Sequence, residues 1–337
     1  MFAACRKASN SASDRYKATV KRPLQIDGSS AGGRSVSACS IVGVIPAAIV
    51  AFQPNHLLAE LLSTLDRNQR RIFVYLNGGV SPEIESRLGG LSNAHVIRNH
   101  ENAGLAHGLN VLAAAAEQEG LTHLQLFDQD SSPEPELPAA LAICFNEALQ
   151  SMPRLAVVAP RLKPPANEYY QEVRIAWRDR LRRTVDFAPT SGSILALAAW
   201  KDVGPFRTDY FIDGIDVEWC LRAWHRGYST LVFEETSMVH RWGSAVPPTE
   251  VWKSQILRQP NDRIYFYVRN AVNILRSSFI PRIWRLRFAL RLFAQLALLL
   301  SARANTVLTR QVVRRAVSDG WNGRLGSFPR ELSTATH

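Results

Sequence analysis

Short apolar runs alternate with stretches of helical periodicity from residue 44 to about residue 160. The apolar runs, which predict strands, cover 44–52, 72–76, 95–97, 123–127 and 155–159. Helical stretches lie between them at 56–65, 103–119 and 136–150. Strands that alternate with helices are typical of right-handed βαβ units, in which the strands run parallel. The pattern predicts an α/β fold with a mostly parallel sheet flanked by helices.

Three regions of different composition divide the chain. Residues 1–39 are rich in Ser, Ala, Gly and basic residues without sustained periodicity, and predict a flexible basic extension. Residues 40–262 hold the α/β pattern. Its second half is less regular, with a strand at 193–198, a helix at 217–226 and a strand at 230–233. Residues 263–337 are arginine-rich and helical in pattern, and predict a helical C-terminal region.

The net charge of +11 is confined to the two ends of the chain. Residues 40–262 carry a net charge of −5, whereas residues 263–330 hold 13 arginines against a single acidic residue. A basic protein can bind nucleic acid, an anionic membrane surface or a phosphorylated substrate. The acidic centre offers no basic groove, and no helix-turn-helix, RRM or zinc-finger pattern is present, so we expect no nucleic-acid partner.

Cysteine usage and apolar runs favour a cytoplasmic protein. The four cysteines are widely separated and form no CxxC pair, which argues against a disulfide framework and a structural zinc site. The N-terminus lacks the apolar stretch of an export signal. Near the C-terminus the longest uncharged apolar run, 292–302, has 11 residues, and a span needs about 20. We therefore expect no membrane span, although a peripheral position on the inner face of a membrane is compatible with the arginines.

Two carboxylates follow the apolar run that ends at Phe127. Asp128 and Asp130 lie in the sequence Asp-Gln-Asp-Ser, at the strand end where open α/β sheets bind their ligands. Carboxylate oxygens suit Mg²⁺ or Mn²⁺, and Mg²⁺ commonly takes one or two of them together with substrate phosphates. Alternatively, the two residues only cap the following helix.

A glycine-containing helix start precedes this strand. Asn102 is suited to cap the helix, and Gly104 and Gly108 permit close approach of the backbone. Asn110 follows within the first turns. An Asn-capped helix alone is commonplace, but its order before the Asp-x-Asp-Ser strand end is much more informative.

In this order of motifs the chain resembles the family 2 glycosyltransferases of GT-A fold, a Rossmann-like fold, and within them the bacterial rhamnosyltransferases with a strand-end Asp-Gln-Asp-Ser. The likeness covers about 44–326. It implies that Asp130 holds a divalent cation on the diphosphate of a sugar nucleotide and that Asp128 lies against the nucleoside sugar. It also implies that an acceptor hydroxyl attacks the anomeric carbon with inversion, without a covalent intermediate. Asn77, Asn102, Gly104 and Asn110 would lie on the donor side.

An acidic helix start at 210–222 resembles the acceptor-side motif of the family. Asp216 takes the position of the family's general base, while Asp213 and Glu218 are acidic neighbours. Inversion requires one base aimed at the incoming hydroxyl. The alternative is an acidic N-terminus that stabilises the helix dipole, with Arg222 pairing Glu218 at i+4.

Three further segments match the family pattern. His240 opens a His-x-x-Gly that relatives carry near the metal and diphosphate, although a lone histidine is often structural. Ser191 and Gly192 lie in a small-residue turn that the resemblance places beside the donor sugar; it could equally be an ordinary turn. The arginines of 263–270 could reach a diphosphate or lipid phosphate, or cap a helix.

One position departs from the family pattern. Relatives usually read Val-Asp-Asn-x-Ser after the second strand, with the Asp on the base, whereas here Leu76 precedes Asn77. Base recognition must then come from Asn77, backbone groups or another loop, so the choice among dTDP, UDP and GDP sugars stays open.

The segment 281–301 mixes arginines with large apolar residues. At 100° per residue Arg282 and Arg285 lie on one side and Arg287 and Arg291 roughly opposite, which is not a simple amphipathic helix. Such a segment can lie at an anionic membrane interface or pack on the α/β domain.

Together these features predict a metal-dependent inverting glycosyltransferase that uses Mg²⁺ or Mn²⁺. We expect it to transfer L-rhamnose from dTDP-rhamnose to a lipid-linked surface polysaccharide such as an O-antigen. Transfer from a UDP- or GDP-sugar is the alternative, and an inactive sugar-nucleotide-binding or nucleic-acid-binding protein is the alternative from another class.

Overall fold

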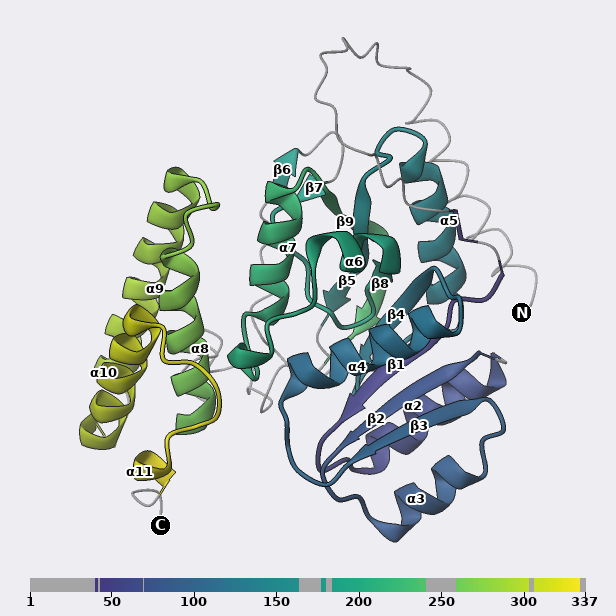
Figure 1. Cartoon of the computed structure of the whole chain (residues 1–337), viewed down its shortest axis with the longest axis horizontal. Helices are drawn as coiled ribbons and strands as arrows, with labels where there is room; N and C mark the ends of the chain where they lie inside the picture. Colours follow the sequence, from purple (N-terminus) through teal and green to yellow (C-terminus); the bar gives the residue numbers. More distant parts are fainter. Residues whose placement is uncertain are drawn as a thin grey trace. The chain divides into compact units, whose positions relative to one another are not determined.

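The first part of the fold is a half-sheet of parallel strands (Figure 1). The structure is a computed structural model, and it describes residues 40–41, 43–68, 70–163, 177–179, 184–240, 259–302 and 306–333. The strands of the half-sheet are β1 (Ala47–Ala51), β2 (Ile72–Asn77), β3 (Ala94–Asn99) and β4 (His123–Asp128). They lie in the order β3-β2-β1-β4, and all three pairings are parallel. The predicted extension 1–39 lies outside the described residues.

Helices connect these strands and cover the sheet. They are α2 (His56–Arg67), α3 (Pro82–Gly89) and α4 (Leu105–Gln118). β1 and β2 are buried along their whole length, which explains their continuous apolar sequences: a parallel strand with both faces covered has no polar face. The predicted strand 44–52 is shorter in the structure, since only Ala47–Ala51 pairs. The parallel pairing brings the carboxyl ends of β1, β2, β3 and β4 to one edge.

The second half of the sheet mixes parallel and antiparallel strands. Its elements are α5 (Leu137–Leu149), β5 (Leu155–Lys163), β6 (Trp177–Asp179), β7 (Thr184–Val185), β8 (Ile194–Ala196), α6 (Leu197–Val203), the 3₁₀ turn η1 (Thr208–Tyr210), α7 (Ile215–His225) and β9 (Ser229–Val239). β8 lies antiparallel between β4 and β5, and β9 runs parallel to β5. The α/β fold class is confirmed, with the antiparallel pairings confined to this half.

Some elements were not expected from the apolar pattern. α3 is amphipathic over only eight residues, although Ser81 caps it and Pro82 takes its first position, both of which are start signals. β6 and β7 have three and two residues, too few to show a period. The predicted helix 103–119 begins later, at Leu105.

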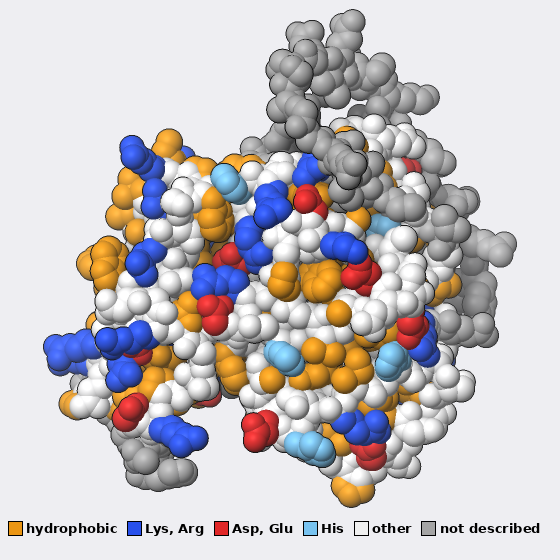
Figure 2. Space-filling model, viewed as in Figure 1, with side chains coloured by type: hydrophobic (Ala, Val, Ile, Leu, Met, Phe, Trp, Pro, Cys, Tyr) orange, Lys and Arg blue, Asp and Glu red, His pale blue; other side chains and the backbone are white. Residues whose placement is uncertain are grey.

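Four helices form the C-terminal part: α8 (Asn261–Leu275), α9 (Arg282–Ala302), α10 (Thr306–Asn322) and α11 (Arg330–Ser333). A second apolar core joins α8, α9 and α10, with Leu292, Leu299 and Val312 among its buried members. Trp284 and Phe288 of α9 also pack against the main core of the α/β domain, so the packing alternative for 281–301 holds for one side of α9. On the surface, hydrophobic and arginine side chains lie together in this part of the chain (Figure 2).

The membrane prediction can be compared with helix length and hydropathy. Among the described helices, none is both long enough and apolar enough to cross a bilayer.

Candidate functional site

The four residues of the Asp-Gln-Asp-Ser motif have different local roles at the end of β4. The Gln129 side chain accepts from the Phe52 N–H at 2.8 Å and donates to the Phe52 carbonyl at 3.0 Å, which ties the loop to the end of β1. The Ser131 N–H donates to the Asp128 carbonyl at 3.0 Å in a tight turn. In an extended strand the side chains of residues i and i+2 lie on one face but are spaced apart along the strand. The turn keeps the carboxylates of Asp128 and Asp130 together at the strand end.

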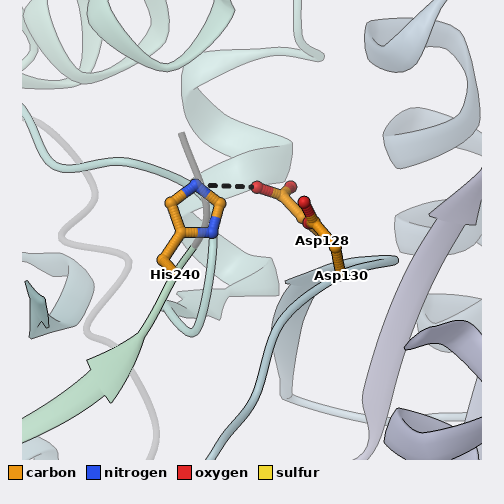
Figure 3. Close-up of side chains that lie close together, drawn as sticks. All are labelled: Asp128, Asp130 and His240. Atoms are coloured by element: carbon orange, nitrogen blue, oxygen red, sulfur yellow. Dashed lines mark ion pairs between the residues drawn. The ribbon is translucent and has the colours of Figure 1, made fainter. Parts of the chain in front are cut away.

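Asp128, Asp130 and His240 converge at this edge (Figure 3). Each offers one ligand atom, and these atoms lie within 4.8 Å of one another. His240 Nε2 lies 3.6 Å from an Asp128 carboxylate oxygen. Two carboxylates and an imidazole form a donor set that fits Mn²⁺, and also Mg²⁺ if substrate oxygens complete its coordination.

The end of β9 reaches the motif through a single backbone bridge. Ser132 pairs with Val239, whose carbonyl accepts the Ser132 N–H at 3.3 Å. The next residue, His240, donates its N–H to the Lys163 carbonyl at 3.0 Å, which holds the imidazole beside the carboxylates. The remainder of the predicted His-x-x-Gly, 241–243, lies outside the described residues.

The protonation states also fit a cation. Burial lowers the pKa of His240 to about 4, although Asp130 opposes this shift, so the imidazole is neutral near pH 7, which is the form that binds metals. Burial raises the pKa of Asp128 to about 6, against the hydrogen bond of Ser191 and the charge of Arg263. A raised carboxyl pKa means that the surroundings do not compensate its negative charge, and a bound cation would do so.

Ser191 lies beside the cluster and Gly192 follows it, whereas their expected position beside the donor sugar stays a prediction. Ser191 Oγ is 2.9 Å from Ser131 Oγ and 3.3 Å from His240 Nδ1, so it orients the imidazole with Nε2 towards Asp128. Gly192 has φ +77°, and a Cβ there would lie 2.9 Å from Pro160. Only glycine fits this turn without moving its neighbours.

Asn77 and Asn102 form one hydrogen-bonded pair at the ends of β2 and β3. Asn77 Nδ2 donates to Asn102 Oδ1 at 2.8 Å, and the Ala103 N–H donates to Asn77 Oδ1 at 2.8 Å. Asn102 does not cap α4 as we expected. It accepts the Gly104 N–H at 3.0 Å, two residues on, because the helix begins only at Leu105. Leu76 is buried in the core, so its side chain cannot contact a base.

Asn110 uses its side chain for the fold. Its amide donates to the Phe206 carbonyl at 2.8 Å and accepts the Phe206 N–H at 2.8 Å, with Trp200 at 3.3 Å. These bonds anchor the loop after α6 to α4. Its expected contact with the donor stays a prediction.

Asp216 lies in the first turn of α7. Burial raises its pKa to about 6, and the negative charges of Asp213 and Asp128 raise it further, which shows that the three carboxylates share one region. Asp216 Oδ1 accepts the Val217 N–H at 2.8 Å. Asp213 is engaged differently: Arg263 donates to both of its oxygens at 2.7 and 2.9 Å. Within the described part of the chain, Arg263 pairs with Asp213 and not with Asp216.

Glu218 is excluded as the base by its surroundings. It is buried, and Arg222 donates to both of its oxygens at 2.9 Å. The predicted i+4 pair between Glu218 and Arg222 therefore forms and stabilises α7, and the role of Asp216 as the base stays a prediction.

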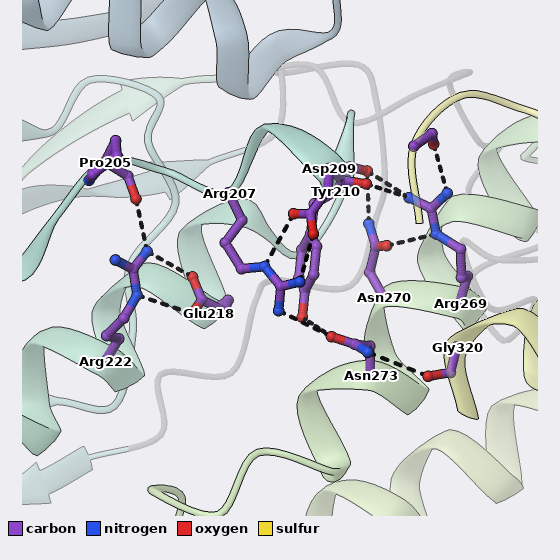
Figure 4. A network of polar contacts seen from close by, with 11 residues as sticks. Pro205, Arg207, Asp209, Tyr210, Glu218, Arg222, Arg269, Asn270, Asn273 and Gly320 are labelled. Atoms are coloured by element: carbon purple, nitrogen blue, oxygen red, sulfur yellow. Dashed lines mark hydrogen bonds and ion pairs between the residues drawn. The ribbon is translucent and has the colours of Figure 1, made fainter. Parts of the chain in front are cut away.

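The polar face of α8 holds the loop that leads to Asp216 (Figure 4). Asn270 Nδ2 lies 2.7 to 3.0 Å from the carbonyls of Tyr210, Ile212 and Asp213. Arg269 is buried and donates to the carbonyls of Tyr210 and Gly326 at 2.9 and 2.6 Å. These two residues therefore position the loop and do not reach a diphosphate. Sequence reasoning did not assign this role, although their adjacent polar side chains in an apolar helix were a usable signal.

Gly104 makes a close contact with the same loop. Its φ is +86°, and a Cβ would lie 2.7 Å from the Phe211 carbonyl oxygen. The Leu105 N–H also donates to that oxygen at 2.7 Å. Gly104 therefore joins the donor side of the site to the loop before Asp216.

Replacing Gly104 by alanine is expected to lower the free energy of unfolding by about 2–4 kcal/mol, because strain at positive φ adds to overpacking. Gly120→Ala is the matched control, since φ is +75° there and no atom lies within 4 Å of the added Cβ. The control should lose only about 1 kcal/mol. Urea unfolding of both variants measures the difference, and equal losses would contradict the close contact.

Known proteins resemble this chain at two levels. No family model matches it. A dTDP-rhamnosyl transferase, RfbF of Shigella flexneri, is 24% identical over 292 residues, which are 84% of this chain and 97% of the relative. The crystal structure of TarS from S. aureus matches with a TM-score of 0.56 and 13% identity, over 87% of this chain. This chain spans 50% of that structure.

A shorter form of the same protein gives the same result. TarS 1–349 in complex with UDP-GlcNAc matches with a TM-score of 0.54 and 13% identity, over 87% of this chain and 83% of TarS 1–349. At such identity the likeness concerns the fold. The chain therefore has the GT-A fold of glycosyltransferases and is related in sequence to a bacterial rhamnosyl transferase, as the resemblance of its strand-end motifs indicated.

Proposed function

We propose that this protein is an inverting, metal-dependent glycosyltransferase. The observation that carries the proposal is the convergence of Asp128, Asp130 and His240 at the end of β4, with the partly buried carboxylate of Asp216 in the same region. Two groups of carboxylates with different surroundings suit two tasks: one holds a cation, and the other accepts a proton.

On the donor side, Asp130, His240 and Asp128 would hold Mg²⁺ or Mn²⁺. A divalent cation there supplies electrostatic stabilisation of the charge that develops on the leaving diphosphate. Ser191 keeps the imidazole oriented, and Asn77, Asn102, Gly104 and Gly192 shape the edge that receives the nucleotide. Leu76 is buried, and the buried Asn77 amide is bound to Asn102 and Ala103, so backbone groups or another loop would recognise the base.

On the acceptor side, Asp216 would take the proton of the attacking hydroxyl. A single base on the face opposite the leaving group yields inversion of the anomeric carbon. Its raised pKa makes the carboxylate a stronger base than an ordinary aspartate, and it stays ionised near pH 7. Arg263 neutralises the adjacent Asp213 and so limits the repulsion between the carboxylates.

The donor that we propose is dTDP-L-rhamnose, and the acceptor is a lipid-linked surface polysaccharide such as an O-antigen. Support for the donor comes from the Shigella flexneri relative, a dTDP-rhamnosyl transferase whose match covers 84% of this chain and 97% of the relative. A lipid-linked acceptor would be met at the inner face of the membrane, by a cytoplasmic enzyme whose domain 40–262 performs catalysis and whose region 263–337 packs beside it. A UDP- or GDP-sugar is the competing donor.

A sugar-nucleotide screen tests this function. Thermal unfolding is measured with dTDP-rhamnose, UDP-GlcNAc or a GDP-sugar, each with and without Mn²⁺ or Mg²⁺. We expect dTDP-rhamnose to raise Tm only with metal, because the cation would hold the diphosphate. A ligand at about 100 times its Kd adds about 2.7 kcal/mol to the free energy of unfolding. Release of dTDP with an acceptor then shows turnover. If UDP-GlcNAc raised Tm and dTDP-rhamnose did not, the donor would be a UDP-sugar. Binding without turnover would favour an inactive sugar-nucleotide-binding protein.

A further inference from the structure

Helix α9 has two opposite apolar faces, and only one of them is buried. Trp284, Phe288, Leu292 and Leu299 point inwards, where Trp284 stacks on Phe288 and donates to Asp186 at 3.0 Å. The outward face carries four large apolar residues with exposed fractions of 62 to 74%: Ile283, Leu286, Leu290 and Phe293. At 100° per residue these four cover an arc of about 80°, roughly opposite the buried face.

We call these four residues the outer stripe of α9. Among the described residues they are four of the ten exposed large hydrophobic side chains, and they lie within three turns of one helix. Isolated exposed hydrophobic residues are ordinary on a protein surface, whereas a continuous row of them marks an interaction site. The stripe thus needs an apolar partner.

Arginines border the outer stripe on both sides. Arg282 lies on one edge, and Arg287 and Arg291 lie on the other, all three exposed. α9 holds no acidic residue in its 21 positions. A partner that complements the stripe must therefore be apolar in the middle and anionic at its borders.

An anionic lipid surface has this chemistry. The acyl region of a leaflet receives apolar side chains, and long arginine side chains at the edges extend to the phosphates. Anionic headgroups attract basic residues near the surface, an attraction that salt weakens. A protein partner would need an apolar groove with acidic groups on both flanks. Any anionic leaflet provides this combination without such a specific arrangement.

The basic edge of the stripe is close to the acceptor side of the site. Tyr267 on α8 donates to Gln295 of α9 at 2.6 Å. Burial raises the pKa of Tyr267, while Arg291 lowers it and Asp213 raises it, so the phenol lies within reach of both charges. Asp213 in turn is bound by Arg263 and acts on Asp216.

We propose that the outer stripe of α9, with Arg282, Arg287 and Arg291, is a docking surface for an anionic membrane leaflet. Docked in this way, the protein presents its acceptor side to molecules anchored in the same leaflet. Vesicle binding does not depend on the proposed function, whereas the meaning of this orientation rests on it.

Co-sedimentation with vesicles tests the surface. The full chain is mixed with vesicles of phosphatidylcholine alone or with 30 mol% phosphatidylglycerol, a composition we choose for the assay, at low and high salt. We expect binding to the anionic vesicles that falls with salt. Phe293→Glu and Leu290→Glu should each reduce the bound fraction at least about tenfold, because a carboxylate in the stripe meets both an apolar phase and negative headgroups.

Matched controls separate position from composition. Ile143→Glu places the same charge on an exposed residue of α5 and should bind vesicles like the wild type. Replacement of Arg287 and Arg291 by glutamine should weaken binding, whereas Arg67→Gln with Lys201→Gln removes the same charge elsewhere and should not.

Three results would overturn the proposal. They are equal binding by Phe293→Glu and Ile143→Glu, no binding of the wild type to anionic vesicles, and a concentration-dependent dimer in lipid-free buffer that Phe293→Glu abolishes. The last would assign the stripe to a second copy of the chain. Donor-induced thermal shifts, measured in the same variants, stay unchanged if only docking is affected, so failure here differs from failure of the proposed function.

Discussion

Asp216→Asn is expected to reduce kcat about 10²–10⁴-fold, the contribution typical of a general base. Asparagine keeps the shape of the side chain but cannot accept a proton. Its carboxamide can still receive the Val217 N–H, which Asp216 Oδ1 receives at 2.8 Å, so α7 should begin as before. The measurement is steady-state transfer from dTDP-rhamnose to a soluble acceptor analogue, together with donor binding, which should remain within about twofold of wild type.

Glu218→Gln is the control for this result. Glu218 lies in the same helical turn, but its bidentate pair with Arg222 is structural. The control should lose stability and keep kcat. If Asp216→Asn instead lost donor binding and Glu218→Gln lost kcat, the assignment of the base would be wrong.

The pH profile provides a second criterion for Asp216. Burial raises its pKa to about 6, and only the ionised form can accept a proton, so kcat/KM should fall as pH decreases through this value. A bound cation favours the ionised form and would shift the limb to lower pH. Asp128 also has a pKa of about 6, so the profiles are measured at saturating Mn²⁺, which keeps that metal ligand ionised. Under this condition Asp216→Asn should lack the limb, whereas Glu218→Gln should retain it.

Asp130→Asn is expected to lower transfer at fixed metal concentration about 10²–10³-fold. The loss reflects several kcal/mol of metal stabilisation of the leaving diphosphate, at 1.36 kcal/mol for each factor of ten. The defect should include metal-dependent donor binding, which distinguishes it from Asp216→Asn. Titration with Mn²⁺, followed by turnover and by the donor-induced shift in Tm, measures it.

Gln129→Ala is the control for the metal ligand. Gln129 is adjacent to Asp130 and ties its loop to Phe52, without belonging to the group of possible ligands. This variant should be less stable, with an unchanged metal requirement once folded. Activity of Asp130→Asn close to wild type at low Mn²⁺ would remove the central premise of the proposed function.

Local sequence patterns predicted the first half of the fold well. Continuous apolar runs identified β1, β2 and β4, since these strands are buried on both faces and their neighbours are helices with a clear period. The motif at Asp128 and Asp130 was recognisable because the glycine-containing helix start precedes its strand, in the order of the family pattern. Short elements such as β6 and β7 contain too few residues for any period to appear.

Long-range partners were less accessible to prediction. The His-x-x-Gly pattern suggested His240 as a metal ligand. Its position beside Asp130 depends on the bridge between Ser132 and Val239, which are more than 100 positions apart in the chain. Asn270 belongs to the segment 263–270, which matched the family pattern, yet its contacts with the loop at Ile212 and Asp213 follow from the packing of α8. Nothing local to 270 indicates which carbonyls will lie opposite it.

The sequence by itself determined the α/β class, the strand ends that carry Asp128 and Asp130, and the concentration of arginine near the C-terminus, because each depends on neighbours in the chain. Only the tertiary structure decided the direction of β8, the hydrogen bonds from Asn270 of α8 to the loop before Asp216, and which face of α9 is exposed. In α9 apolar residues lie on opposite sides of the helix, so the sequence shows no single apolar face. Which side faces the core depends on α8 and α10, and the pattern along one helix contains no information about its neighbours.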